Sequence, residues 1–166
     1  IRYVKKSGAT LCFQPGTHQL RLGIDAIQPL IAASRVAIMN KEEAERLVGD
    51  ESKSMTVLLK RLRAQGCAIA VITDGPKGSY SYDGTDFLKL GIMDVPVIER
   101  TGCGDAYATA FVAALHYGKG VGDAMRWGTA NAASKLGHIG PQAGLIKKHE
   151  MSRWLARFAD IQPQMM

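Results

Sequence analysis

The sequence predicts an α/β fold in which a mostly parallel β-sheet is flanked by helices in three layers. Short β-rich runs alternate with helical patterns along the whole chain, and this alternation is typical of strand-helix-strand units. Of the 166 residues, 46% are hydrophobic and 22% are charged, which is enough apolar material for one buried core. We find no internal repeat or low-complexity tract. We therefore expect a single α/β domain over residues 1–166.

The first half of the chain contains three short apolar runs that are typical of buried strands, with helical patterns between them. Lys41 begins a helix with acidic residues in its first turn, where the helix dipole stabilises them, and Gly49 ends it. The next helix has apolar residues at i, i+3, i+4 and i+7, which form one face. The predicted strands are 9–13, 36–39 and 68–73, and the predicted helices are 24–33, 41–48 and 55–62.

The second half begins with a predicted antiparallel hairpin, residues 79–83 and 87–90, joined by a turn at Asp83-Gly84. A strand at 95–99 is expected to lead into Thr101–Asp105. After it we expect a helix of small residues at 106–117, a second long helix at 121–136 and a loop at 137–144. The apolar residues of a closing amphipathic helix are Trp154, Leu155, Phe158 and Ile161.

Charge and hydropathy exclude several classes of protein. The net charge of +6 comes from lysines and arginines scattered along the chain, so we expect no nucleic-acid partner. No stretch approaches the roughly 18 consecutive apolar residues of a membrane span, and the N-terminus has no signal-peptide pattern. We expect a cytoplasmic protein that does not associate with membranes. Cys12, Cys67 and Cys103 are too far apart for a CxxC metal site and are expected to be free thiols.

The segment Thr101–Asp105 is the first candidate site. Glycines at a helix start let the backbone approach an anion, and the first helical N–H groups point at it. Asp105, in the first turn, would be a weak base by pKa but a well-positioned one, which suffices for phosphoryl transfer. A purely capping role for Asp105 explains the spacing equally well. Cys103 has no histidine near it in the sequence to activate it as a nucleophile.

Two further strand ends carry candidate residues. The segment Thr73–Gly78 is a glycine-containing turn after a predicted strand, where open α/β sheets usually bind ligands, although a plain turn is the simpler interpretation. Asn40 and Glu43 follow another strand. A carboxylate there can hold Mg²⁺ through water, while helix capping explains the pair equally well. Three such strand ends in one domain make coincidence less likely than any one of them suggests.

Residues 97–111, V-I-E-R-T-G-C-G-D-A-Y-A-T-A-F, resemble the C-terminal signature D-T-x-G-A-G-D-x-F of the ribokinase/PfkB carbohydrate kinase family. The resemblance implies the Rossmann-like ribokinase fold. It also implies that Gly102, Cys103 and Gly104 form an anion hole and that Asp105 is the catalytic base. The departures from the signature are Glu99, Arg100, Cys103 and Tyr107. Because the first of these positions helps to bind a monovalent cation in some members, K⁺ is expected near Glu99 and Thr101.

The resemblance extends in order along nearly the whole chain. Asn40–Glu43 is similar to the family's N-x-x-E motif for Mg²⁺ and phosphate, which implies a metal role for Glu43. The nucleotide loop would comprise Thr73, Asp74, Gly75 and Gly78. Asn131 would lie beside the adenine of ATP, and residues 137–144 would close over it.

The function implied is phosphorylation by Mg²⁺-ATP of a hydroxyl group on a small sugar or nucleoside. Family members are about twice as long as this chain, their first half carries the substrate motif and lid, and the chain begins at Ile1. The sequence is therefore expected to be a fragment. An alternative is that it is catalytically inactive and acts only in nucleotide binding or subunit association, including homo-oligomers, through an exposed sheet edge. A redox enzyme on a Rossmann-type sheet is weaker, because no Gly-x-Gly-x-x-Gly follows the first strand.

Overall fold

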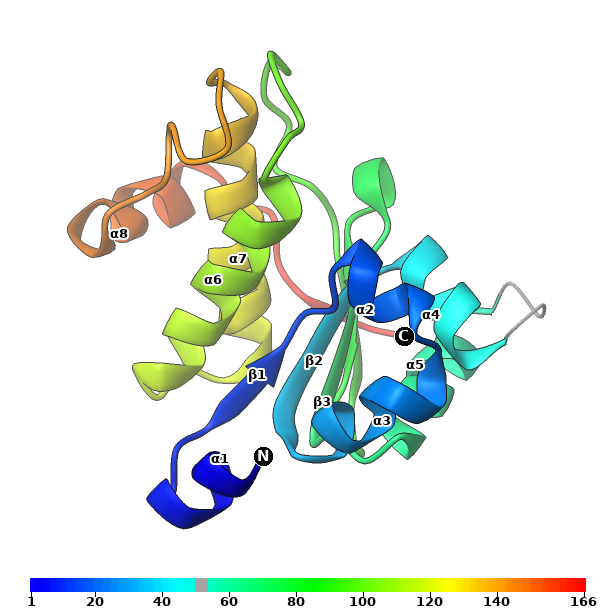
Figure 1. Ribbon diagram of the computed structural model, residues 1–166. Helices are drawn as coiled ribbons and strands as arrows, with labels where there is room; N and C mark the ends of the chain where they lie inside the picture. The colour runs from blue at the N-terminus through cyan, green and yellow to red at the C-terminus, as the bar shows by residue number, and fades with distance from the viewer. Residues whose placement is uncertain (50–53) are drawn as a thin grey trace. The chain divides into compact units, whose positions relative to one another are not determined.

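The computed structural model describes residues 1–49 and 54–166 and divides into two compact units. Unit 1 comprises residues 1–74 and 80–87, and unit 2 comprises residues 75–79 and 88–166. The described helices are α1 (Arg2–Ser7), α2 (Thr17–Arg21), α3 (Ile24–Ala32), α4 (Lys41–Val48), α5 (Met55–Ala64), α6 (Cys103–His116), α7 (Val121–Leu136) and α8 (Lys148–Arg157), with a 3-10 turn, η1, at Gly75–Lys77 (Figure 1). The described strands are β1 (Leu11–Phe13), β2 (Ser34–Asn40), β3 (Ile69–Thr73), β4 (Ser79–Tyr82), β5 (Phe87–Leu90) and β6 (Gln164–Met165). Hydrogen bonding orders them β1-β2-β3-β4-β5-β6 in a sheet.

Unit 1 is built on the parallel strands β1, β2 and β3. Helices α3, α4 and α5 lie together on one face of these strands (Figure 1), and their apolar side chains pack on alternate strand residues. Val36 and Ile38 of β2 alternate with these residues along the strand and are also buried. The core contains Leu20, Ile27, Ile31, Ala37, Met39, Ala44, Leu47, Leu58, Leu59, Leu62, Cys67, Ala70, Ile72 and Tyr80.

Unit 2 is organised by the close packing of α6 on α7. The buried face of α6 consists mainly of alanines, with Tyr107, Phe111 and Leu115 as its large side chains. Gly128 of α7 lies directly against the Tyr107 ring: a Cβ atom at this position would come within 2.9 Å of the ring carbons. Small residues on both helices therefore bring the two backbones close together.

The other side of α7 packs on α8. A cluster of buried residues, Met93, Ala130, Ala133 and Met151, joins the two helices to the extended segment that precedes α6. Arg126 of α7 donates hydrogen bonds to the carbonyl oxygens of Leu155 and Ile161, at 3.1 Å each. These carbonyls lie at and just beyond the C-terminal end of α8, where a cation stabilises the helix dipole.

One predicted strand is wrong. Residues 95–99 form no strand and bend at Ile98, because the N–H groups of Ile98 and Glu99 donate to the carbonyl oxygen of Leu136, at the end of α7, instead of to a neighbouring strand. The helix that follows begins at Cys103, three residues before the predicted start, and α8 ends at Arg157, before Phe158 and Ile161. The short elements α1, α2 and β6 were not predicted.

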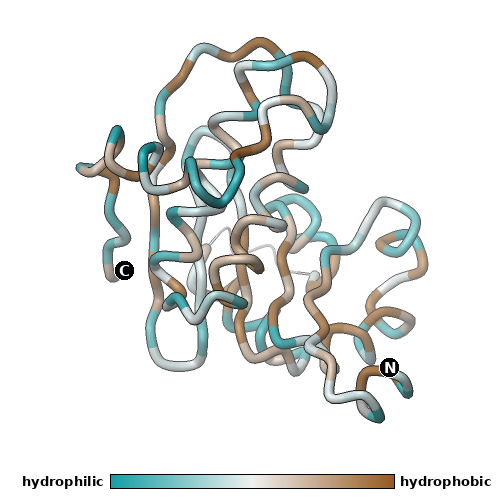
Figure 2. Tube along the Cα trace, turned by 90° about the vertical axis from the view of Figure 1, so that its left-hand side faces the viewer, coloured by the Kyte–Doolittle hydropathy of each residue, from teal (hydrophilic) through white to brown (hydrophobic). Residues whose placement is uncertain are grey.

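Hydrophobic and hydrophilic stretches alternate along the chain (Figure 2), and among the described residues no helix is both long and apolar enough to cross a membrane.

The contact between α6 and α7 leads to a stability prediction for Gly128→Ala. The added methyl group must displace the buried Tyr107 ring, which costs about 1–3 kcal/mol, while alanine regains up to about 1 kcal/mol of helix propensity. We expect a net loss of about 1–2 kcal/mol in the free energy of unfolding, measured by urea titration.

Gly91→Ala is the matched control, because Gly91 is exposed outside the helices and strands, a Cβ atom there meets no atom within 4 Å, and its φ is not positive. It should leave stability within about 0.5 kcal/mol of wild type. A Gly128→Ala protein as stable as this control would contradict the packing argument.

Candidate functional site

The ends of β2 and β3 lie side by side in unit 1. Asn40 and Thr73, the last residues of these strands, are register partners in the parallel pair. Asp74 follows immediately. Two of the three predicted strand ends therefore meet at the same edge, which is where open α/β sheets usually bind ligands.

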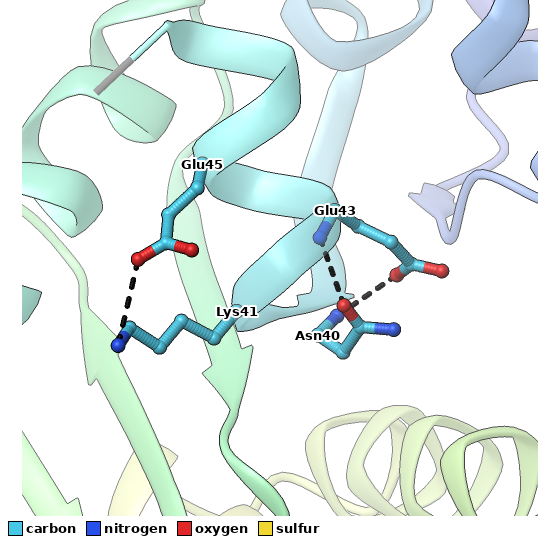
Figure 3. Close-up of polar contacts among 4 residues, drawn as sticks. All are labelled: Asn40, Lys41, Glu43 and Glu45. Atoms are coloured by element: carbon cyan, nitrogen blue, oxygen red, sulfur yellow. Dashed lines mark hydrogen bonds and ion pairs between the residues drawn. The ribbon is translucent and has the colours of Figure 1, made fainter. Parts of the chain in front are cut away.

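Asn40 and Glu43 form a reciprocal capping box at the start of α4 (Figure 3). The Asn40 side-chain oxygen accepts a hydrogen bond from the Glu43 N–H at 2.8 Å, and the Glu43 carboxylate accepts one from the Asn40 N–H at 2.9 Å. Both N–H groups lack helical acceptors, so the pair stabilises the helix start. An ion pair between Lys41 and Glu45, at 3.4 Å, supports the same turn. The capping role is thus confirmed, and the metal role of Glu43 stays a prediction.

The turn Gly75–Gly78 belongs to unit 2 and includes η1. Gly78 is buried with φ +92°, and its N–H donates to the Gly75 carbonyl oxygen at 3.1 Å. A side chain at Gly78 would collide with the Leu90 carbonyl oxygen. Gly75 is exposed, also has positive φ, and has open space around its Cα. The need for glycine at position 78 is thus explained by the neighbouring backbone of Leu90. Gly75 has no such neighbour, so its exposed backbone leaves room for a ligand.

The loop before α6 is fixed by Gly102. This residue has φ +82°, and a Cβ atom there would come within 2.7 Å of the Pro141 carbonyl oxygen. Both its backbone conformation and its surroundings require glycine. The Gly102 carbonyl oxygen accepts the first hydrogen bond of α6, from Ala106, at 2.9 Å. The N–H group of Gly104, in the first turn, has no acceptor within the helix, and Gly104 is exposed. The start of α6 therefore leaves the Gly104 N–H group open, and the anion hole expected there stays a prediction.

Asp105 is the third residue of α6 and is exposed. Its carboxylate lies in the first turn of the helix. The neighbouring Cys103 is half-buried, and burial raises the pKa of its thiol. Because the thiolate is the reactive form, Cys103 is poorly suited to nucleophilic catalysis. Asp105 is the residue of this turn that can take a proton from a ligand.

Glu99 links the loop before α6 to the loop after α7. Its carboxylate accepts a hydrogen bond from the Gly140 N–H at 2.6 Å. This bond, together with one from the Thr101 side chain and the nearby charge of Lys135, holds the pKa of Glu99 below its usual value. The two loops, each predicted to contact the nucleotide, are therefore joined by a charged hydrogen bond.

The buried side chain of Asn131 connects α6 to the segment that follows α7. Its side chain is 5% exposed, its amide nitrogen donates to the Ala106 carbonyl oxygen at 2.8 Å, and its amide oxygen accepts from the Ile146 N–H at 2.8 Å. Both ends of the amide are therefore engaged within unit 2. Its predicted place beside adenine stays a prediction.

Sequence reasoning missed Lys135. This residue, one turn after Asn131 on α7, is fully buried, and its ammonium donates to the carbonyl oxygens of Glu99 and His138. A lysine in the last turn of a helix is usually exposed and binds the last carbonyl groups of that helix. The residue type and position of Lys135 therefore did not indicate burial. The available signal was its spacing of four residues from Asn131, which places both side chains on one face.

The predicted site residues are divided between the units. Unit 1 carries Asn40, Glu43, Thr73 and Asp74, and unit 2 carries Gly75, Gly78, Glu99, Thr101, Gly102, Cys103, Gly104, Asp105 and Asn131. Within the part of the chain that the structure describes, no three His, Cys, Asp or Glu residues gather as a metal cage.

The Glu99 hydrogen bonds lead to a pH prediction. Because folding holds the pKa of Glu99 below its ordinary 4.5, the ionised form stabilises the fold above that pH, and this contribution is lost as the pH falls through the folded-state value. Glu99→Gln should be less stable than wild type near neutral pH, and the difference should shrink in acid. Urea unfolding at a series of pH values measures it.

Thr101→Val is the matched comparison, since it removes one of the hydrogen bonds to Glu99 and leaves the carboxylate. Thr101→Val should also lose stability near neutral pH, by a smaller free energy than Glu99→Gln, and this loss should likewise shrink in acid. A Glu99→Gln difference that is constant across the whole pH series would contradict the assignment.

Comparison with known proteins identifies the family. The profile of the pfkB family carbohydrate kinases matches residues 3–148. Relatives include an ATP-dependent 6-phosphofructokinase of Thermoanaerobacterium thermosaccharolyticum (26% identical, covering 82% of this chain and 43% of the relative). A 5-dehydro-2-deoxygluconokinase of Shouchella clausii is 27% identical and covers 97% of this chain and 48% of the relative. A cytidine kinase of Thermococcus kodakarensis is 29% identical and covers 68% of this chain and 40% of the relative. The chain thus spans less than half the length of these relatives.

Solved structures show the same fold. The ribokinase of Thermotoga maritima matches with a TM-score of 0.80 at 23% identity, over 93% of this chain and 52% of its own. A ribokinase-like protein of E. coli, solved in complex with ATP and Mg²⁺, matches with a TM-score of 0.82 at 19% identity, over 94% of this chain and 51% of its own. The fold is therefore the α/β ribokinase fold predicted from the sequence, and the chain belongs to the pfkB family of carbohydrate kinases.

Proposed function

We propose that this chain supplies the ATP-binding and catalytic part of a kinase that transfers the γ-phosphoryl group of ATP to a hydroxyl group of a sugar or nucleoside. The observation that carries the proposal is the first turn of α6, where the fixed glycine turn Gly102–Gly104 and the exposed carboxylate of Asp105 lie together. One turn of the helix thus offers both N–H groups that can bind a phosphate and a carboxylate that can act as a base.

The N–H groups of Gly102 and Gly104 would hold the transferring phosphoryl group, while the N–H group of Cys103 donates to the Arg100 carbonyl oxygen at 3.2 Å and steadies the turn. Backbone donors at a helix start carry partial positive charge and are already oriented, so they stabilise the charge that develops on the phosphoryl oxygens. The left-handed conformation of Gly102 and its contact with Pro141 keep this turn in place before ATP arrives. Preorganisation of this kind costs no rearrangement during the reaction.

Asp105 would accept the proton of the attacking hydroxyl group. The hydroxyl oxygen forms the new bond to the γ-phosphorus, the bond to the β-phosphate oxygen breaks, and ADP leaves. Because the proton is lost late in phosphoryl transfer, the position of the carboxylate matters more than its strength as a base. The exposure of Asp105 allows a small alcohol to reach it.

Mg²⁺ would neutralise the phosphate charge when it is bound with ATP. Magnesium sites in kinases use one or two carboxylates and the phosphates instead of an all-protein cage, which fits the absence of a carboxylate cluster among the described residues. Glu43 would hold the ion through water, and Asn40 fixes its carboxylate. Thr73, Asp74 and Gly75 would line the nucleotide loop.

The acceptor is proposed only as a class. The relatives carry the names of a phosphofructokinase, a deoxygluconokinase and a cytidine kinase, so their printed substrates share a sugar hydroxyl group. Asn131 would act at the nucleotide by fixing the backbone at Ile146, since its amide is already engaged there.

Mg²⁺-ATP binding can be tested with Gly102→Ala and calorimetric titration. The substitution forces alanine into positive φ and against Pro141, so the anion-binding turn must move. We expect saturable binding by wild type and affinity at least about tenfold weaker in the variant.

Gly118→Ala is the matched control, because Gly118 has φ +76° but a Cβ atom there meets nothing within 4 Å. It should lose about 1–2 kcal/mol of stability from the backbone strain alone and keep its ATP affinity. Equal ATP affinity in both variants would contradict the phosphate site.

The role of Asp105 can be tested with Asp105→Asn, which keeps the shape of the side chain and removes the base. Turnover should fall by about 10²–10⁴-fold, while ATP affinity stays within about threefold. The assay measures ADP formation that depends on added sugars or nucleosides.

Asp123→Asn is a close control. Asp123 is likewise the third residue of its helix after a glycine N-cap and is exposed. Both variants should lose about 0.3–1 kcal/mol of helix-dipole stabilisation, but only the Asp105 variant should lose turnover. Unchanged turnover in Asp105→Asn would reject the assignment of the base.

A further inference from the structure

The buried ammonium group of Lys135 sits between the two loops of the phosphate site. Its side chain has 0% exposure, and Nζ donates to the carbonyl oxygen of Glu99 at 3.0 Å and to that of His138 at 3.2 Å. Both distances are those of ordinary hydrogen bonds to a charged donor. A fully buried lysine is rare and needs compensation for its lost hydration.

That compensation comes from the same loops. The Glu99 carboxylate interacts electrostatically with Lys135 and is itself held by the Gly140 N–H and the Thr101 side chain. The positive charge of Lys135 therefore lies among carbonyl oxygens and a carboxylate contributed by residues 99–101 and 138–140. These segments flank the anion-binding turn, because Gly102 contacts Pro141.

This arrangement is what a bound monovalent cation would require. K⁺ and an ammonium group have the same single charge and similar size, and each is stabilised by backbone carbonyl oxygens. A K⁺ ion coordinated by the Glu99 and His138 carbonyl oxygens would have to share them with the Lys135 ammonium and would be repelled by its charge. The residues present therefore do not fit an exchangeable cation at this place.

We infer that Lys135 is a built-in cation: its ammonium takes the place of the monovalent cation expected near Glu99 and Thr101. The loops are consequently organised without potassium. The inference about the ion stands on the contacts of Lys135 alone, and only its consequence for ATP rests on the proposed function.

The first experiment uses the unmodified chain. Its melting temperature and its Mg²⁺-ATP affinity are measured in KCl, NaCl and choline chloride at constant ionic strength. We expect the same melting temperature in all three salts and ATP dissociation constants that agree within about twofold. A saturable stabilisation by K⁺ over both Na⁺ and choline would reveal an exchangeable site and overturn the inference, even without any ATP binding.

The second experiment uses Lys135→Ala, which removes the ammonium and leaves space beside the two carbonyl oxygens. In choline chloride we expect a lower melting temperature and an ATP dissociation constant raised at least about tenfold, because the carbonyl groups lose their donor. KCl or propylammonium chloride should restore both by refilling the space. Lys119→Ala, which removes an exposed lysine of the same unit, should behave as wild type.

The outcomes separate the two hypotheses. If wild type is indifferent to the salt but does not bind ATP, the proposed function fails and the built-in cation stands. If Lys135→Ala folds but neither K⁺ nor propylammonium raises its melting temperature, the inference fails, whether or not the variant is less stable than wild type. If Lys135→Ala does not fold in choline, its refolding on addition of KCl or propylammonium supports the inference, and its failure to refold with either leaves the salt comparison of the wild type to decide.

Discussion

The contact between α7 and the segments around it is the constraint on which the candidate site depends. Three residues on one face of α7, Gly128, Asn131 and Lys135, are spaced by three and four positions, which places them in a row along the helix. Gly128 sets the approach of α6, Asn131 binds the backbone of Ala106, and Lys135 binds the loop at Glu99. The position of Asp105 therefore follows from α7, although α7 contributes no catalytic group.

Several candidate residues have a structural task that is sufficient to explain them. The capping box of Asn40 and Glu43 stabilises the start of α4, and Gly78 makes room for the backbone of Leu90. A structural task does not exclude binding, because capping also fixes the direction in which the Glu43 carboxylate points. For Gly102 the proposed binding role agrees with the structural one, because the same left-handed conformation fits beside Pro141 and begins α6.

The parts of the fold that depend on local sequence were predictable. Acidic residues and Gly49 define α4, whose bounds were predicted correctly, and the strand ends at Asn40 and Thr73 meet as expected. The strand at 95–99 was wrong because its hydrogen bonds go to the end of α7, which is distant in sequence. The contacts of Lys135 were missed for a similar reason: its spacing from Asn131 indicates a shared face, but one of its two carbonyl partners, Glu99, is 36 residues away in the sequence. Local patterns give elements and motifs, whereas the partners of a buried charge depend on tertiary packing.

The charged contacts of Glu99 and Lys135 also constrain how the two loops can move. Separating residues 99–101 from residues 138–140 would expose a buried ammonium group without its carbonyl partners and would break the bond between Glu99 and Gly140. Such a separation resembles local unfolding more than the opening of a flexible lid. The ligand of the proposed phosphate site would therefore meet a preformed rim, and its rate of entry would be set by diffusion and electrostatic attraction instead of by loop motion.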